Sequence, residues 1–226
     1  MASTEFTPRE RRLVSRLQTP AQVQAYLNRL PYNYETHGET LRGFRGVVRH
    51  GEAHCLEACL FAAVVLEQHG YPPLVISFES LDKLDHVIYV YKERGRWGSI
   101  ARSRDPGLHG RLPVFASARA LAASYVDPYV DFTGRVLGFG LANLADEMGT
   151  YDWRFSTKNV WKVEQMLIDF PHRKLGMSDA RYRRLHARYE AFRAAHGDRK
   201  PVSYYEGRER WAPLPKDRTW ERTGGR

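Results

Sequence analysis

Residues 51–70, GEAHCLEACLFAAVVLEQHG, constrain the fold more than any other stretch of this chain. Their apolar side chains fall nearly all round a helical wheel, which is typical of a helix buried in a core. The helix is expected to begin near His54 and to end at Gly70, because glycine often follows a helix end and prolines come directly after Tyr71. We therefore predict one central, buried helix.

Three strands are predicted after this helix. LVISFES (74–80), a segment from about Asp85 to Lys92, and WGSIA (97–101) are rich in β-branched and aromatic residues. Gly95 lies in the short connection 93–96, which suits a hairpin turn. A long helix followed by an antiparallel meander predicts an α+β fold.

The rest of the chain divides into helical and irregular parts. Helical spacing of apolar residues predicts helices within 8–18, 21–30, 117–129, 157–170 and 178–197, whereas 32–54 and 130–149 are glycine-containing and are expected to be irregular. We expect a core with N-terminal helices over residues 1–150 and a helical extension over 151–197. Residues 198–226 form a basic tail, either disordered or binding a partner.

Composition narrows the class of protein. The chain has 226 residues, 42% of them hydrophobic, which is enough for the core of one large domain. Two cysteines make no disulfide framework, and the N-terminus has no apolar signal core, so we expect a reduced, cytoplasmic location. The longest apolar run falls far short of the ~20 residues of a membrane span, so no membrane partner is expected. A net charge of +9 favours an acidic partner.

Cys55 is the candidate nucleophile. A thiol at a helix start feels the positive end of the helix dipole, which favours the reactive thiolate. His86 opens the otherwise apolar strand HVIYVY, where an imidazole needs a polar partner, and a thiolate would supply one. The alternative is that Cys55 is a small core residue. Cys59, one turn further on, is expected to be buried and inert.

These residues resemble the transglutaminase-like branch of the papain-type cysteine enzymes. That family has a Cys at a helix start, an acidic residue two positions later, a Gly-x-Pro ending the helix, a strand opened by His, and then a Trp. The corresponding residues here are Cys55, Glu57, Gly70-Tyr71-Pro72, His86 and Trp97. The flanking stretches LPYNYETHGET and VFASARALAASYVDPY resemble an uncharacterised bacterial group of such proteins.

The resemblance implies a papain-like core, in which the Cys-bearing helix packs on a small antiparallel sheet with further helices C-terminal to it. It also implies a thiol enzyme acting on amide bonds of a protein or peptide substrate. Cys55 would form a thioester and His86 would transfer protons, so that hydrolysis, deamidation or transamidation follows according to the acceptor. This chemistry requires no cofactor and no metal.

The sequence departs from the family at the third catalytic position. The family's Asp, which orients the imidazole, falls on Ala101. Asp105 or Ser103 would have to orient His86 instead, although Asp105 also reads as the turn residue of an Asp-Pro-Gly sequence. An oxyanion hole would need the Cys55 N–H and a second donor, for which Tyr32 and Asn33 are the candidates.

Three other functions compete with this one. His54, Cys55, Cys59 and His86 include zinc-ligand types, but their spacing is not that of a zinc site. Loss of the family's Asp favours a catalytically inactive, basic interaction module. RYRRLHARYEAFR mixes arginines with aromatics, as in some nucleic-acid-binding proteins, although its aromatics are spaced to pack inward and no binding motif is present.

The tail aromatics pack either on a partner or on the chain's own surface; they are Tyr204, Tyr205, Trp211 and Trp220.

Overall fold

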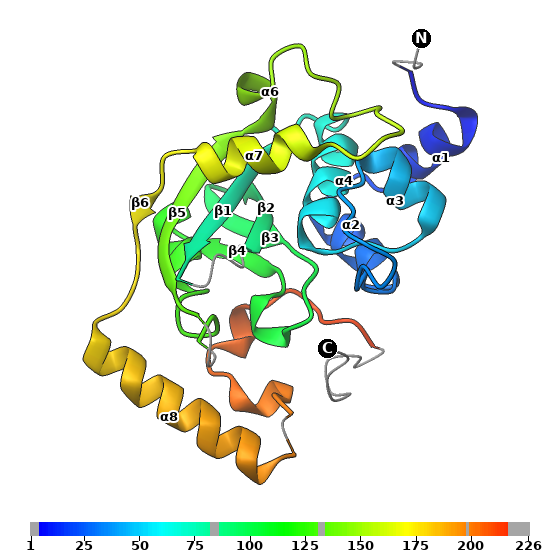
Figure 1. Ribbon diagram of the computed structural model, residues 1–226. Helices are drawn as coiled ribbons and strands as arrows, with labels where there is room; N and C mark the ends of the chain where they lie inside the picture. The colour runs from blue at the N-terminus through cyan, green and yellow to red at the C-terminus, as the bar shows by residue number, and fades with distance from the viewer. Residues whose placement is uncertain (1–4, 82–85, 131–133, 198, 217–226) are drawn as a thin grey trace.

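The computed structural model describes residues 5–81, 86–130, 134–197 and 199–216, and its fold is α+β, as predicted. A six-stranded antiparallel sheet has the order β4-β3-β2-β1-β5-β6 (Figure 1). Its strands are β1 (Leu74–Ser80), β2 (His86–Glu93), β3 (Arg96–Ile100), β4 (Arg111–Phe115), β5 (Val136–Asn143) and β6 (Arg173–Lys174).

Helices surround this sheet. They are α1 (Pro8–Arg16), α2 (Pro20–Leu27), α3 (Phe44–His50), α4 (Cys55–Glu67), α5 (Ala118–Ala123), α6 (Leu144–Glu147), α7 (Trp161–Asp169) and α8 (Asp179–Ala195), with the 3₁₀ turns η1 (Pro106–Leu108), η2 (Val202–Tyr204) and η3 (Arg208–Arg210). Helices α1 to α4 gather on one side of the sheet (Figure 1). None of the helices within the described ranges is both long and apolar enough to cross a membrane.

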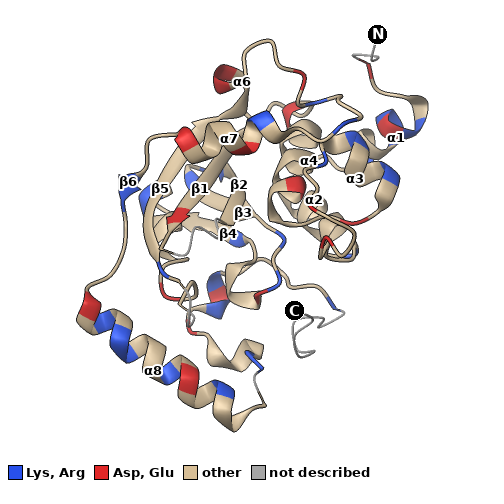
Figure 2. Cartoon of the chain, in the orientation of Figure 1, with Lys and Arg blue, Asp and Glu red and all other residues tan. Residues whose placement is uncertain are grey.

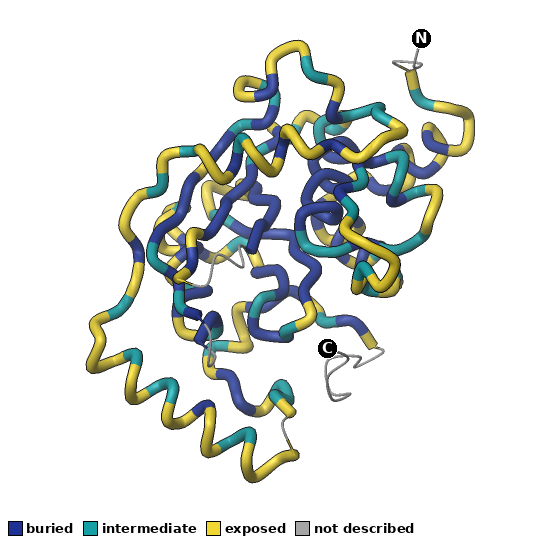
Figure 3. The backbone as a smooth tube through the Cα atoms, viewed as in Figure 1, coloured by how far each residue is buried: buried dark blue, intermediate teal, exposed yellow. Residues whose placement is uncertain are grey.

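The central helix α4 begins and packs as its sequence predicts. His54 is its N-cap, with its Nδ1 3.3 Å from the Leu56 backbone nitrogen, and the Glu57 carboxylate accepts a hydrogen bond from the His54 N–H. Every residue from Leu56 to Leu66 is buried (Figure 3). The helix ends at Glu67, and Gly70 then turns the chain with a φ of +82°.

Two apolar cores lie on opposite faces of the sheet. Alternate side chains of β2, among them Val87 and Tyr89, join α4 in the first core, whereas Ile88 and Val90 face the second core with Leu121 of α5. The central strands are therefore buried on both faces. This explains why β2 is an almost continuous apolar run rather than an alternating one.

The expectation that residues 130–149 are irregular is wrong. They contain β5, which pairs with the whole length of β1. Its glycines are required by close neighbours: a Cβ at Gly138 would lie 2.9 Å from a Glu79 carboxylate oxygen, and one at Gly140 would lie 2.8 Å from the Phe170 ring. The glycines suggested an irregular backbone, but here they permit close packing within a strand.

Two other segments can be compared with their predictions. The loop 32–54 contains the short helix α3. Residues 151–197 are continuous with the core, because β6 pairs with β5 and α7 contributes Val163 and Leu167 to the first apolar core. In α8 the stripe of Tyr182, Leu185, Tyr189 and Phe192 is more buried than the rest of the helix, as the spacing predicts.

The segment 199–216 is not an extended or disordered tail. It folds back on the molecule, and its aromatic residues Tyr204, Tyr205 and Trp211 form a third apolar cluster with Tyr189. Of the two alternatives for these aromatics, packing on the chain's own surface is the one observed. Trp220, and the basic residues beyond position 217, lie outside the described residues.

Candidate active site

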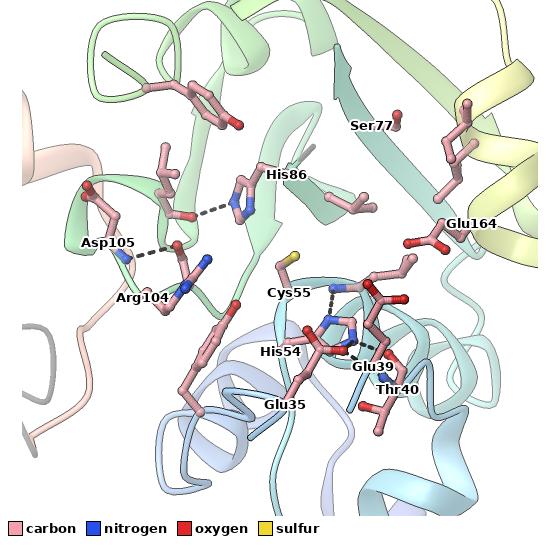
Figure 4. Close-up of a pocket in the computed structure, with 18 of the residues that line it drawn as sticks. Glu35, Glu39, Thr40, His54, Cys55, Ser77, His86, Arg104, Asp105 and Glu164 are labelled. Atoms are coloured by element: carbon pink, nitrogen blue, oxygen red, sulfur yellow. Dashed lines mark hydrogen bonds and ion pairs between the residues drawn. The ribbon is translucent and has the colours of Figure 1, made fainter. Parts of the chain in front are cut away.

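One cavity of about 730 Å³ contains most of the residues that the sequence singled out. It opens where the start of α4, the start of β2, the η1 turn and α7 converge (Figure 4). Cys55, His86 and Asp105 all line it, together with His54, Tyr32 and Ser103. Side chains distant in sequence therefore meet around one half-buried cysteine residue.

The thiol of Cys55 lies between two imidazoles. Figure 4 shows the His86 ring on one side of the sulfur and the His54 ring on the other. Burial favours the neutral thiol, but hydrogen bonds from His54 and His86, together with their charges, lower the pKa of Cys55 to about 5. At neutral pH the sulfur is therefore a thiolate, the nucleophilic form.

His54 is the histidine that sequence reasoning did not use. Burial opposes its charged form, but the Cys55 sulfur, Glu57 and the Thr40 carbonyl raise the pKa of His54 to about 9. Its Nε2 donates to the Thr40 carbonyl at 2.9 Å in either protonation state. Its Nδ1 lies 3.3 Å from the Leu56 N–H, a long contact that only a neutral ring accepts, whereas a protonated ring donates to the sulfur. The adjacent thiolate favours the protonated ring.

Glu57 holds the start of α4 in place. Its buried carboxylate accepts hydrogen bonds from Asn33 Nδ2 at 3.0 Å, Thr40 Oγ1 at 2.8 Å and the backbone N–H groups of Arg42 and His54 at 3.0 and 3.1 Å. Burial would raise the pKa of Glu57, but the His54 charge and these donors lower it. The carboxylate is therefore ionised, and it fixes the loop 33–42 against the nucleophile's helix.

His86 is oriented by a backbone carbonyl. Its Nε2 lies 2.8 Å from the Leu108 carbonyl oxygen at the end of η1, so Nε2 carries a proton and donates it. The remaining ring nitrogen, Nδ1, is the one left for the sulfur of Cys55. The rings of Phe78 and Tyr125 pack beside the imidazole, each with its centroid 6.1 Å from the centroid of the His86 ring, and they limit its rotation. The orientation that a triad carboxylate would give is thus supplied by the main chain.

The prediction that Asp105 or Ser103 orients His86 does not match the observed contacts. The Asp105 carboxylate instead accepts the Gly107 N–H at 2.7 Å and pairs with Lys200 Nζ at 2.9 Å. Ser103 Oγ accepts the Asp105 N–H at 3.1 Å. Asp105 is the N-cap of η1, as the Asp-Pro-Gly sequence suggested, because its short carboxylate suits a turn start.

Ala101, where the resemblance places an Asp, is fully buried in the second core. Gln24 of α2 binds its backbone on both sides, since Oε1 accepts the Ala101 N–H at 3.0 Å and Nε2 donates to the Ala101 carbonyl at 3.0 Å. The position is thus structural. It has no polar side chain to offer the imidazole.

Of the two candidates for the oxyanion hole, only Tyr32 has a side chain available in the cavity. Asn33 is buried and committed to Thr40 and Glu57, so it does not serve. Tyr32 lines the cavity, and burial followed by the nearby Cys55 charge raises the pKa of its phenol, so the hydroxyl stays protonated and able to donate. The first turn of α4 adds backbone N–H groups that have no acceptor within the helix.

Charged side chains line the rest of the cavity wall. Glu35, Glu39 and Glu164 lie on one side of the thiol, and Arg104 and Asp105 lie on the other (Figure 4). Helix α7 contributes Trp161, Glu164 and Ile168 from one face, at spacings of three and four residues. Trp161 is 41% exposed and Ile168 is 56% exposed, so α7 offers the cavity an accessible apolar surface.

The competing constellations are weaker than this one. Cys59 is buried, and burial raises the pKa of its thiol, so it stays neutral. Within the described ranges no three His, Cys, Asp or Glu side chains gather as a metal site would require. The arginines of α8 are interleaved with acidic residues (Figure 2), and Arg181 and Arg188 pair with Asp127 and Glu206.

No family model matches this sequence, and no curated protein matches it either. The side chains of the cavity themselves define what it can do. They provide a thiolate nucleophile, an imidazole with one ring nitrogen fixed by a carbonyl, a second imidazole, and a phenol that can donate. Such a set is suited to attack on a carbonyl carbon followed by proton transfer to a leaving group.

Proposed function

We propose that this protein is a transglutaminase-like thiol enzyme that acts on amide bonds of a protein or peptide. The observation that carries the proposal is the Cys55 thiol, which has a pKa of about 5 and lies between His54 and His86 in an open cavity. A buried structural cysteine would have its pKa raised, as Cys59 does.

The reaction would proceed in two halves. The Cys55 thiolate adds to the carbonyl carbon of the amide, and the carbonyl electrons move onto oxygen. The C–N bond then breaks while protonated His86 delivers its proton to the departing nitrogen, which leaves a thioester on Cys55. In the second half, His86 removes a proton from the acceptor as it attacks, and the thiolate departs. Water as acceptor gives hydrolysis or deamidation, and an amine gives transamidation.

Two groups are positioned to stabilise the oxyanion. They are the backbone N–H of Cys55, at the first turn of α4, and the Tyr32 hydroxyl. His54 would keep the thiolate populated between turnovers, because its imidazolium is a fixed positive charge beside the sulfur. The apolar face of α7 would contact the substrate chain next to the reacting amide.

The proposal is tested by alkylation and by product analysis. Iodoacetamide labelling of Cys55, followed peptide by peptide across pH, is expected to reach its plateau far below the ~8.5 of a free thiol. A glutamine-containing peptide incubated with and without a primary amine then separates cleaved, deamidated and transamidated products by mass. An ordinary thiol at Cys55, unaffected by His86→Ala, would instead favour the inactive interaction module.

A further inference from the structure

The carboxylate of Asp105 is held by two side chains from the far end of the chain. Lys200 Nζ lies 2.9 Å from its Oδ2, and the Tyr205 hydroxyl donates to its Oδ1. The same Oδ1 accepts the Gly107 N–H at 2.7 Å, which makes Asp105 the cap of η1. Two residues about a hundred positions downstream therefore fix the residue that starts this turn.

The rest of the segment 199–216, which we call the strap, follows the chain after η1. The Tyr205 ring packs so closely on Gly107 that any Cβ there would collide with it. The Ala212 N–H donates to the Gly110 carbonyl at 3.0 Å, and Trp211 forms a backbone bridge with Arg111. The strap therefore contacts both the start of η1 and the residues that follow its end.

Lys200 is immobilised to an unusual degree for a lysine. Its ammonium lies 4.8, 5.7 and 5.2 Å from the ring centroids of Tyr189, Tyr204 and Tyr205. It also donates to the Pro128 and Val130 carbonyls at 3.3 and 3.4 Å. A cation held from this many directions is a fixed anchor rather than a solvated surface charge.

We propose that the strap positions the catalytic histidine, with Lys200 and Tyr205 as the positioning residues. The route runs from these two side chains through Asp105 to η1, whose last residue presents its carbonyl to His86 Nε2 at 2.8 Å. A three-residue 3₁₀ turn has little rigidity of its own, so the place of that carbonyl depends on what clamps the turn. This inference rests on the proposed function. It identifies the residues that hold the His86 imidazole in place beside Cys55.

The strap thereby substitutes for the missing triad carboxylate. In a triad, a side chain on a strand orients the imidazole directly. Here Ala101 occupies that place, and orientation passes to a loop carbonyl that needs external support. Asp105 contributes through the turn it caps, not through contact with His86.

Four variants test the strap. Tyr205→Phe removes the hydroxyl that binds Asp105, and Tyr204→Phe is its matched control, because Tyr204 packs in the same cluster and no hydrogen bond of its hydroxyl is seen within the described residues. Lys200→Met removes the ammonium, and Lys200→Arg restores a cation. The readouts are the pH profile of iodoacetamide labelling at Cys55 and the melting temperature.

Tyr205→Phe and Lys200→Met are each expected to move the labelling inflection upward by about one pH unit, equivalent to tenfold less thiolate on the acid side. Tyr204→Phe should keep the wild-type profile, and Lys200→Arg should recover most of the shift. If Tyr205→Phe does not fold, the Lys200 pair decides the matter. Wild-type inflection near pH 5 with unchanged profiles in Tyr205→Phe and Lys200→Met overturns the strap's role alone. A wild-type inflection near that of a free thiol overturns the proposed function itself.

Discussion

The Nε2 atom of His86 lies 2.8 Å from the carbonyl oxygen of Leu108. A carbonyl oxygen accepts a hydrogen bond but carries no full charge, so it fixes the tautomer and the direction of the ring without the stabilisation that a carboxylate gives to an imidazolium. His54, whose pKa is raised to about 9, adds a positive charge on the other side of the sulfur. The main chain therefore orients His86, as one Asp would, whereas the charge of His54 stabilises the thiolate and not the His86 imidazolium.

The first prediction concerns the thiolate. Labelling of Cys55 by iodoacetamide should rise with an inflection near pH 5, since that is the pKa set by the two imidazoles. His54→Gln and His86→Ala should each move the inflection upward, and Cys59→Ala, the matched cysteine control, should leave it in place. Equal labelling of Cys55 and Cys59 at pH 6 would contradict this.

The second prediction concerns turnover. Cys55→Ala should abolish amide chemistry, and His86→Ala should reduce it by about 10²–10⁴-fold, the usual contribution of a positioned acid–base group. Rates measured on a peptide amide by chromatography test this. Both proteins should retain wild-type circular dichroism, because neither substitution removes a large part of a core. Undiminished turnover in Cys55→Ala would exclude a thioester.

The third prediction concerns the absent carboxylate. Ala101→Asp should destabilise the protein and should not raise its activity. The new carboxylate would be buried in an apolar core while Gln24 already occupies the backbone of that residue, and burying an unpaired charge costs several kcal/mol. Denaturant unfolding beside Ala101→Ser, a smaller polar change, measures the effect. A gain in turnover would mean that the η1 carbonyl is a poor substitute for Asp.

The fourth prediction concerns Glu57. Glu57→Ala should lower the unfolding free energy by about 3 kcal/mol or more, because it leaves buried donors unpaired. The folded-state pKa of Glu57 is depressed, so its stabilisation is complete above the ordinary pKa near ~4.3 and is lost as pH falls through the lower folded value. Urea unfolding of the wild type and of Glu57→Gln at pH 3 to 7 should differ least at the acid end. A constant difference would contradict the assignment.

The fifth prediction concerns α7. Trp161→Ala and Glu164→Gln should raise KM for a peptide substrate, because both side chains line the cavity. Trp161→Ala should also leave iodoacetamide labelling of Cys55 unchanged, because an indole carries no charge. Lys162→Gln, on the same helix but outside the cavity lining, is the matched control. An unchanged KM in both lining variants would remove α7 from the substrate path.

The central helix and three of the strands were predictable because their signals are local. The apolar run of α4 and the β-branched and aromatic runs of the strands each depend on neighbours in sequence. Strand β5 was missed because its glycines make room for Glu79 and Phe170, which lie far away along the chain. No sequence pattern distinguishes a glycine that permits close packing from one that ends a strand.

The candidate site divides in the same way. Cys55 and His86 have reactive side chains and stand at the start of a helix and of a strand, so they could be recognised from the sequence. Leu108 acts through its carbonyl, which every residue possesses, and so nothing in its side chain indicates the role. His54 was missed because histidine is not among the usual N-cap residues, although Glu57 stands three residues on, as in a capping box.

Tyr205 and Asp105 are a hundred positions apart along the chain. During synthesis, Cys55 and His86 are made long before the strap, and strand β5 and helices α7 and α8 must be made in between. A growing chain that ends before residue 199 therefore contains both Cys55 and His86 but lacks the contacts of Lys200 and Tyr205 with Asp105. Contacts between such distant residues also cost more loop-closure entropy than local ones, which slows folding. If the strap positions His86 as proposed, the thiol is expected to reach its full reactivity only after this segment has been made and has folded back on the sheet.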